Sequence, residues 1–176
     1  MMSNVYVISD CHFGHRNILK YRDRFSTIES HDQFIMGNIA KTLRKRDVLW
    51  MLGDCFFTKE SLEYLRIIKT QCLHVNLVLG NHDTDSSEGR ANIGVMINEG
   101  LINKVGGMFK AKGKRWMTHC PIHPDELRGC TNIHGHVHNS TIEDPRYFNA
   151  SCENINYTPI LIQDCVYNQV EKVCDE

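Results

Sequence analysis

The chain has 176 residues and a formal net charge of −1, with 41% hydrophobic and 23% charged residues. This is the composition of a globular protein, and the length suits one domain, so we expect residues 1–176 to form a single domain. With 20 basic and 21 acidic residues, the chain has no excess of positive charge. There is therefore no strong signal for nucleic-acid binding, and any phosphate must be bound locally.

Signals for a membrane or an oxidising compartment are missing from the sequence pattern. No apolar run approaches the ~18 residues needed to span a bilayer. No basic segment followed by an apolar one marks a secretion signal. The eight cysteines form no CxxC pair, which argues against a zinc ribbon. We therefore expect a cytoplasmic protein with reduced thiols and no membrane partner, whose oligomeric state stays open.

Five apolar segments predict strands, and each is followed by a polar cluster. In chain order the segments are residues 4–9, 47–52, 74–79, 114–118 and 131–133. The clusters that follow them are Asp10-Cys11-His12, Gly53-Asp54, Gly80-Asn81-His82-Asp83, His119 and His134-Gly135-His136. Near-continuous apolar strands of this kind are typical of central strands that are buried on both faces.

Helical patterns lie between these strands. Apolar residues recur at helical spacing over residues 30–46 and 59–69 and, more weakly, over residues 86–100. Ser30 or Asp32 is the expected N-cap of the first helix. The remaining expected elements are a hairpin over residues 104–115 that turns at Lys112-Gly113, and strands over residues 146–151 and 159–164.

The positions of the polar clusters predict one site. In open α/β sheets, ligands bind in the crevice outside the carboxyl ends of the strands, and every cluster stands at such an end. Three histidines also alternate over residues 133–139, namely His134, His136 and His138. Imidazole is a common metal ligand. Taken alone, this tract is equally well explained as a polar loop that happens to be rich in histidine.

Taken together, the clusters resemble the signature of the calcineurin-like metallophosphoesterases. That signature is D-x-H, G-D, G-N-H-[D/E], a later histidine and G-H-x-H. All five blocks stand in this order within residues 10–138. The segments "SDCHFGHRNI" and "RYFNASCENINYTPI" also look like the small bacterial and phage members of this family. The resemblance thus covers nearly the whole chain.

The resemblance implies two divalent metal ions. The ligands it implies are Asp10, His12 and His138 for the first ion, Asn81, His119 and His136 for the second, and Asp54 as a bridge between them. Nitrogen and oxygen donors without thiolate suit Mn²⁺, Fe or Zn²⁺ and disfavour a structural zinc site. Mn²⁺ is the ion we expect first, with Fe, Zn²⁺ and Ni²⁺ as alternatives.

The resemblance also implies a reaction, in which a hydroxide that bridges the two ions attacks phosphorus in line. His82 would be the general acid that protonates the departing oxygen, and Asp83 would accept a hydrogen bond from the other ring nitrogen of His82. His15, Asn17 and Asn81 are the expected substrate contacts. For His15 and Asn17, capping of a short helix over "FGHRNILKY" is an equal alternative.

Other residues beside the motifs are expected to be structural. His134 has no counterpart among the family's ligands, so we expect it to support the site or the fold instead of binding metal. Cys11, Cys55 and Cys120 each adjoin a motif residue. Free cysteine behaves as a small buried hydrophobe, so we expect all three to pack beneath the site, with soft metal ligation or redox sensing as the alternative.

We therefore expect an α/β fold, a two-sheet sandwich flanked by helices, with a dinuclear metal site at the carboxyl ends of the strands. The expected activity is metal-dependent hydrolysis of a phosphate ester, as a phosphodiesterase or phosphomonoesterase on a nucleotide-like or other small organic phosphate. A non-catalytic metal-binding interaction scaffold and a protein phosphatase are the alternatives. Gly53-Asp54 is followed by Cys55-Phe56-Phe57-Thr58, which departs from the protein phosphatase pattern.

Overall fold

The computed structural model describes residues 3–166, which form two mixed sheets and a layer of helices. The first sheet has the strand order β4-β3-β2-β1-β9. Its strands are β1 (Val5–Ile8), β2 (Val48–Met51), β3 (His74–Val78), β4 (Lys104–Gly106) and β9 (Ile160–Leu161). The strands β1 to β4 run parallel, and only β9 is antiparallel to its neighbour.

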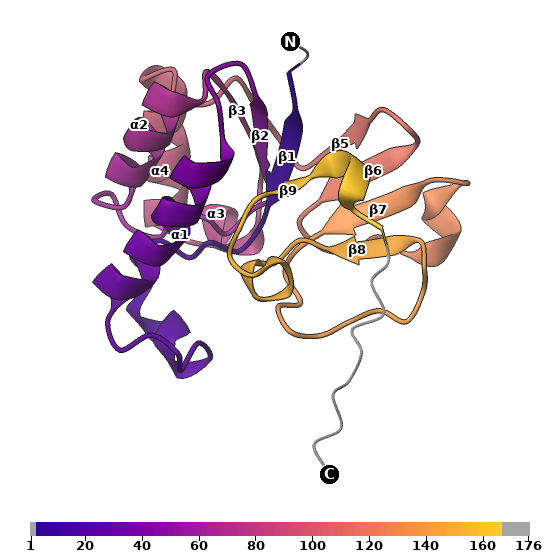
Figure 1. The fold of residues 1–176 in the computed structure, drawn as a ribbon, viewed down its shortest axis with the longest axis horizontal. Helices are drawn as coiled ribbons and strands as arrows, with labels where there is room; N and C mark the ends of the chain where they lie inside the picture. The colour runs from indigo at the N-terminus through magenta and orange to yellow at the C-terminus, as the bar shows by residue number, and fades with distance from the viewer. Residues whose placement is uncertain (1–2, 167–176) are drawn as a thin grey trace.

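The second sheet has the order β5-β6-β7-β8 and lies beside the first (Figure 1). Its strands are β5 (Met108–Ala111), β6 (Arg115–Thr118), β7 (Thr131–His134) and β8 (Tyr147–Asn149). The strands β6, β7 and β8 run parallel, and β5 pairs antiparallel with β6. In both sheets, therefore, the carboxyl ends of several parallel strands lie side by side, and the loops that follow them can meet there.

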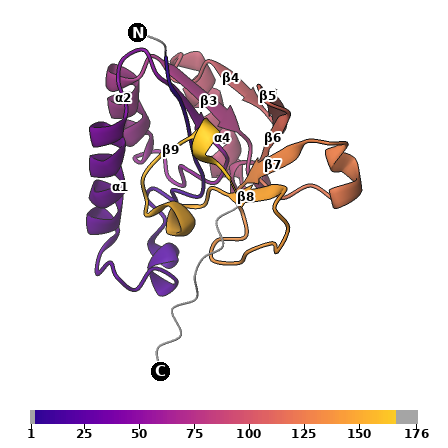
Figure 2. The same ribbon diagram turned by 45° about the vertical axis from the view of Figure 1, so that its right-hand side comes forward.

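Helices cover the face of the first sheet that is turned away from the second sheet, as both ribbon views show (Figures 1 and 2). The α-helices are α1 (Ile28–Thr42), α2 (Leu62–Gln71), α3 (Asn81–Asp85) and α4 (Ser87–Asn98). Short 3₁₀ helices are η1 (Arg16–Lys20), η2 (Pro124–Leu127), η3 (Cys152–Ile155) and η4 (Ile162–Asp164). The two-sheet sandwich with flanking helices is confirmed.

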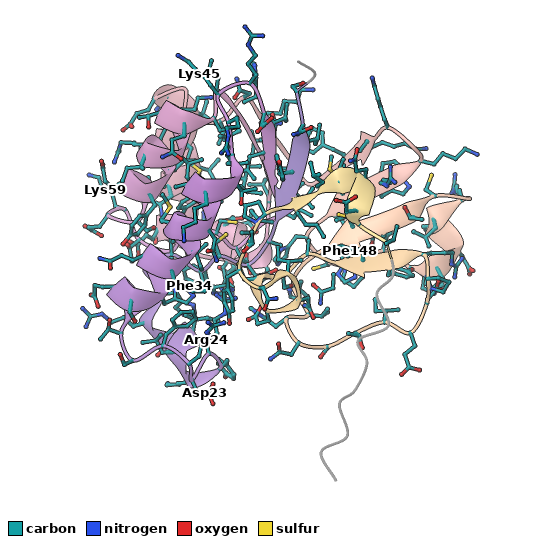
Figure 3. All side chains as sticks on the ribbon, in the orientation of Figure 1. Asp23, Arg24, Phe34, Lys45, Lys59 and Phe148 are labelled. Atoms are coloured by element: carbon teal, nitrogen blue, oxygen red, sulfur yellow. The ribbon has the colours of Figure 1, made fainter. Side chains whose placement is uncertain are left out.

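Two apolar cores hold these layers together. Buried residues of the first sheet, such as Leu49 and Leu77, pack with Ile35 of α1 and Leu65 of α2. On the other face of the sheet, residues of β1 and β2 pack against Met117, Ile133 and Phe148 of the second sheet, and Phe148 is labelled in Figure 3. Because the first sheet is covered on both faces, its central strands β1 and β2 carry no charged residue and are largely buried, as their sequences predict.

Some expected boundaries and partners differ from those observed. Thr27 caps α1 through a capping box with Ser30, so the expected caps at Ser30 or Asp32 are wrong. The turn at Lys112-Gly113 does join two antiparallel strands, β5 and β6. Residues 104–106, however, pair with β3 in the first sheet, so the expected hairpin is shorter than residues 104–115. Within residues 3–166, no helix has the length and apolar character needed to cross a membrane.

Candidate metal centre

The loops that follow β1, β2, β3, β6 and β7 meet at one edge of the two sheets. Backbone hydrogen bonds continue the pairing beyond the strands, since Asp10 N donates to Gly53 O (3.1 Å) and Gly135 N donates to His119 O (2.8 Å). A further bond crosses from one sheet to the other, in which His136 N donates to Oδ2 of Asp10 (2.9 Å). The convergence of the polar clusters follows from this shared edge.

The backbone at this edge is strained. Five of the seven candidate ligands adopt the left-handed conformation, which non-glycine residues rarely do. Their φ angles are 55° at Asp10, 53° at His12, 53° at Asp54, 70° at His136 and 48° at His138. Such strain persists only where surrounding contacts enforce it, and it clusters at functional sites.

One group of candidate ligands is formed by Asp10, His12 and His138, whose ligand atoms all lie within 4.8 Å of one another. Oδ1 of Asp10 and Nε2 of His12 are 3.9 Å apart. Both atoms are buried and have no hydrogen-bond partner within residues 3–166. The other carboxylate oxygen of Asp10 is fixed by Ser151 Oγ (2.9 Å). Buried polar atoms without partners are costly, and a cation between these two would satisfy both.

A second group surrounds the His119 ring. Its Nε2 lies 3.2 Å from Asp54 Oδ2, 3.0 Å from Asn81 Oδ1 and 3.2 Å from His136 Nδ1. Its Nδ1 donates to the carbonyl oxygen of Leu52 (2.8 Å). In its neutral form, a ring held in this way would present the lone pair of Nε2 to a cation shared with the other three ligand atoms, which is the arrangement of a metal-binding histidine.

Charge at the two groups also fits divalent cations. Asp10, Asp54 and His119 themselves have ligand atoms within 4.8 Å of one another, so the two groups adjoin. Burial lowers the pKa of His12 well below its ordinary value, which keeps the ring in the neutral, metal-binding form. Although burial opposes it, the hydrogen bond with Asp54 raises the pKa of His119 to about 9. Only the neutral ring can be a metal ligand, so a cation at this group would have to displace that proton.

The expected partnership of His82 and Asp83 is wrong. Asp83 is buried, and its Oδ2 accepts from the backbone N of Gly80 (2.8 Å) and of Asp54 (3.1 Å). Burial raises the pKa of Asp83 to about 6. The carboxylate nearest to the His82 ring belongs to Asp85, 3.6 Å from Nδ1. The His82 side chain is 43% exposed, so its ring faces solvent beside the site.

Of the two expected substrate contacts at the start of η1, His15 lies beside the candidate ligand His12, whereas the contact expected of Asn17 stays a prediction. His15 and His12 share a hydrogen bond between their Nδ1 atoms (2.9 Å), and the His15 ring stacks on Phe57 with centroids 4.0 Å apart. His15 stands at the N-cap position of η1, but its side chain makes no capping bond. Asn17 lies exposed on η1, and its side chain makes no hydrogen bond within residues 3–166.

The three cysteines beside the motifs differ from one another. Cys11 and Cys55 are fully buried, as expected. Cys120 is exposed, so the expectation that it packs beneath the site is wrong. Its sulfur lies within 4.8 Å of ligand atoms of both His119 and His136. The thiol thus borders the second group of candidate ligands.

His134 supports the loop that carries its two neighbours in the histidine tract. It is buried, and its Nδ1 donates to the carbonyl oxygen of Gly135 (2.9 Å). No candidate metal group within residues 3–166 includes it. This agrees with the structural role expected for it.

Arg22 and Glu153 are site residues that the motif search missed. Nδ1 of His138 donates to Oε1 of Glu153 (3.0 Å), and Nε of Arg22 donates to the same oxygen (2.8 Å). Burial raises the pKa of Glu153, but His138 and Arg22 outweigh it and lower that pKa to about 2. The sequence did hold one signal for Glu153. It stands just after the strand expected over residues 146–151, in the same position relative to its strand as the other polar clusters.

The chain matches the sequence model of the calcineurin-like phosphoesterase family over residues 3–153. The protein MJ1445 of Methanocaldococcus jannaschii is 26% identical to it over 97% of this chain and 93% of that protein. The gene 66 protein of Mycobacterium phage L5 is 33% identical over 47% of this chain and 41% of its own length.

A solved structure has the same fold over nearly the whole chain. It is the protein AQ665 of Aquifex aeolicus, described as a protein of unknown function. It superposes with a TM-score of 0.71 at 28% identity, covering 92% of this chain and 97% of that one.

Proposed function

Because the chain belongs to the calcineurin-like phosphoesterase family, we propose that it hydrolyses esters of small organic phosphates, nucleotides among them, with two divalent metal ions. Membership of the family makes the chain a metal-dependent hydrolase of phosphate esters. The substrate class, the two-ion centre and the residue roles are our proposals.

The observation that carries the two-ion proposal is the pair of buried, unpartnered atoms, Oδ1 of Asp10 and Nε2 of His12, next to the group around His119. In this proposal Asp10, His12 and His138 would hold the first ion, Asn81, His119 and His136 would hold the second, and Asp54 would be a ligand shared by both. When bound, a pair of divalent ions activates water near neutral pH and offsets the negative charge of the phosphate. Mn²⁺ is the ion we propose.

His82 is the proposed general acid. Its backbone N donates to Oδ1 of Asp54 (2.9 Å), which places the residue next to the proposed bridge, while its ring remains open to solvent. The ring centroids of His82 and the candidate ligand His12 are 6.1 Å apart, so the His82 ring stands beside the first group of candidate ligands. Asp83 serves another purpose, because its carboxylate holds the backbone amides of Gly80 and Asp54.

Flat rings beside the candidate ligands favour a substrate with a planar organic group. The half-buried His15 and Phe57 rings are nearly parallel, with 3° between their planes, and the Phe57 and His82 centroids are 5.0 Å apart. Aromatic and histidine rings contribute favourable stacking with other rings. This wall supports a nucleotide or a similar aryl-containing phosphate as substrate.

The test is hydrolysis with and without metal. Metal-depleted protein, reconstituted with Mn²⁺, is assayed on nitrophenyl phosphate, bis-nitrophenyl phosphate, 2′,3′- and 3′,5′-cyclic nucleotides, dinucleotides and phosphomonoesters. We expect Mn²⁺-dependent hydrolysis, with a nucleotide preferred over the simple esters. Metal-replete protein that is inert on the whole panel would favour a non-catalytic scaffold and overturn the proposal.

A further inference from the structure

A buried guanidinium lies directly behind the first group of candidate ligands. Arg22 is 2% exposed, whereas Tyr21 and Asp23 on either side of it are exposed. Charged side chains are almost never fully buried unless they are paired, because removal from water disfavours the charge. The partners of Arg22 should therefore reveal why the charge is there.

Most hydrogen bonds of Arg22 go to the loop after β1 and to Glu153 at the candidate centre, while its guanidinium also lies over the Tyr157 ring, 5.3 Å from the centroid. Its Nη2 donates to the backbone carbonyl of Asp10 (2.7 Å), and its Nη1 donates to that of Cys11 (3.3 Å). Its Nε donates to Glu153 (2.8 Å), and its Nη1 also contacts Nε2 of His31 (2.8 Å). The fork of donors on arginine is suited to such a set, which lysine cannot bind in full.

The two carbonyls that Arg22 binds, those of Asp10 and Cys11, lie between the two strained residues of the loop after β1. Asp10 and His12 both hold a left-handed backbone there, with φ of 55° and 53°. That shape turns the Asp10 carboxylate and the His12 ring toward the same point. Because strain of this kind must be enforced by surrounding contacts, the guanidinium is a physical reason for the loop's shape.

Glu153 connects the same guanidinium to the third candidate ligand of the group. Its Oε1 accepts from both Arg22 and Nδ1 of His138. A carboxylate oxygen can only accept, so Nδ1 of His138 carries the proton and the lone pair of Nε2 is left free. A carboxylate behind a histidine in this manner fixes the tautomer and orientation of a metal ligand.

The network continues to α1 on the other side of Arg22. Nδ1 of His31 pairs with Oδ1 of Asp32 (2.7 Å), and Oδ2 of Asp32 accepts from the backbone N of Gly14 (3.0 Å). His31 and Asp32 are also buried. The loop after β1 is thus held at both ends from one connected set of charges.

We propose that Arg22 and Glu153 are positioning residues for the first metal site: Arg22 holds the loop that carries Asp10 and His12, and Glu153 holds the ring of His138. This rests on the proposed function, since it assumes a cation between those three residues. Three of the four hydrogen bonds of Arg22 go to the loop that carries Asp10 and His12 or to the carboxylate that holds His138, a choice of partners that an ion pair serving only the fold does not require.

The test compares Mn²⁺ binding by full-length wild type, Glu153→Gln and Glu99→Gln, under conditions in which all three are folded. Glu99 is the matched control, because it too is paired with an arginine, Arg66, but on the exposed surface and away from the candidate ligands. Loss of such a residue behind a metal ligand weakens binding by ~10–100-fold. We expect this loss at one of two Mn²⁺ sites in Glu153→Gln and none in Glu99→Gln.

A second variant keeps the test decisive if Glu153→Gln does not fold. Arg22→Lys retains the charge but has three donors on a single nitrogen, which cannot reproduce the four bonds of the guanidinium, so it should weaken the same Mn²⁺ site. Wild-type affinity at both sites in the folded variant, with only a lower unfolding free energy, would show a merely structural role and overturn the proposal. Wild-type protein that binds no Mn²⁺ would overturn the proposed function as well.

Discussion

Gly80 offers a sharp test of where the Asp54 carboxylate lies. It directly precedes Asn81, with φ of −92° and ψ of 176°, a conformation that alanine adopts without strain. A methyl group added there would overlap Oδ1 of Asp54 and lie 2.7 Å from the backbone N of the same residue. The substitution Gly80→Ala therefore acts by displacing Asp54 and not by straining its own backbone.

The size of the effect follows from these contacts. Overpacking a tight interior costs ~1–3 kcal/mol. The displaced carboxylate also loses the bond from the backbone N of His82, and hydrogen bonds to a charged group contribute ~1.5–3 kcal/mol. With partial relaxation, we expect the unfolding free energy of the metal-free protein to fall by about 2–4 kcal/mol. Mn²⁺ binding should weaken by ~10–100-fold, as for other residues that support metal ligands.

The assays are urea denaturation of the metal-free protein and Mn²⁺ binding in competition with a chelator. Gly94→Ala is the matched control, because Gly94 lies in α4 and an added methyl would meet no atom within 4 Å. Alanine is the better helix former by ~0.5–1 kcal/mol, so this control should be slightly stabilised and bind metal normally. If Gly80→Ala binds Mn²⁺ as tightly as the wild type, the Asp54 carboxylate is not a ligand in the place described.

His82→Ala should lower the rate of hydrolysis of a nucleoside ester by ~10²–10⁴-fold, because its departing alkoxide needs a proton. The same variant should keep much of its activity on nitrophenyl phosphate, and its metal content should be that of the wild type. Equal losses on the two esters would exclude the general-acid role. Asp54→Asn should lose more bound metal and more activity than His12→Ala, because a bridging carboxylate serves both ions. The control is Asp23→Asn, which removes an exposed carboxylate and should behave as wild type. Metal analysis of the purified variants decides this, and a normal metal content in Asp54→Asn would contradict the bridge. For Glu153, the folded state lowers the pKa from 4.5 to about 2, so its stabilising effect is present above pH 4.5 and is lost as the pH falls from there toward 2. Its size is on the order of 3 kcal/mol at 1.36 kcal/mol per pKa unit. The difference in unfolding free energy between metal-free wild type and Glu153→Gln should therefore shrink on acidification, and a difference independent of pH would refute this.

The convergence of the polar clusters was predictable because it depends on strand direction alone. Apolar strands that end in Asp10, Asp54 and Asn81 are neighbours in one parallel sheet, and those that end in His119 and His134 are neighbours in the other. Parallel strands bring their carboxyl ends to one edge, whatever the exact boundaries of each strand. The ordered motifs added the chemistry of the candidate ligands.

The partners of individual side chains were not predictable in the same way. His82 and Asp83 are adjacent on a helix that begins at Asn81, and adjacent helical residues do not face one another. Asp83 instead occupies the third helical position, from which a side chain reaches back to the amide of Gly80 at the helix start. The carboxylate three residues after His82 is Asp85, which is the one that lies near its ring.

Arg22 shows a second limit of sequence reasoning. Between exposed neighbours it has the pattern of a surface arginine, and only tertiary packing against Glu153 and the loop after β1 buries it. The burial of a single charged residue leaves no periodic pattern in the sequence, so it could not be read from the sequence. The short strand Lys104–Gly106 is similar, since three residues do not determine which of two sheets they join.

Metal stoichiometry is the most direct test of a dinuclear phosphoesterase centre. Metal-free protein is titrated with Mn²⁺ while bound metal, electron paramagnetic resonance, melting temperature and hydrolysis of bis-nitrophenyl phosphate are followed together. We expect two ions per chain, a spin-coupled signal that marks neighbouring Mn²⁺ ions, a melting temperature that rises with binding, and hydrolysis that appears as the second ion binds. A chain that binds one ion or none, with a melting temperature indifferent to Mn²⁺ and to chelator, would contradict the proposed centre.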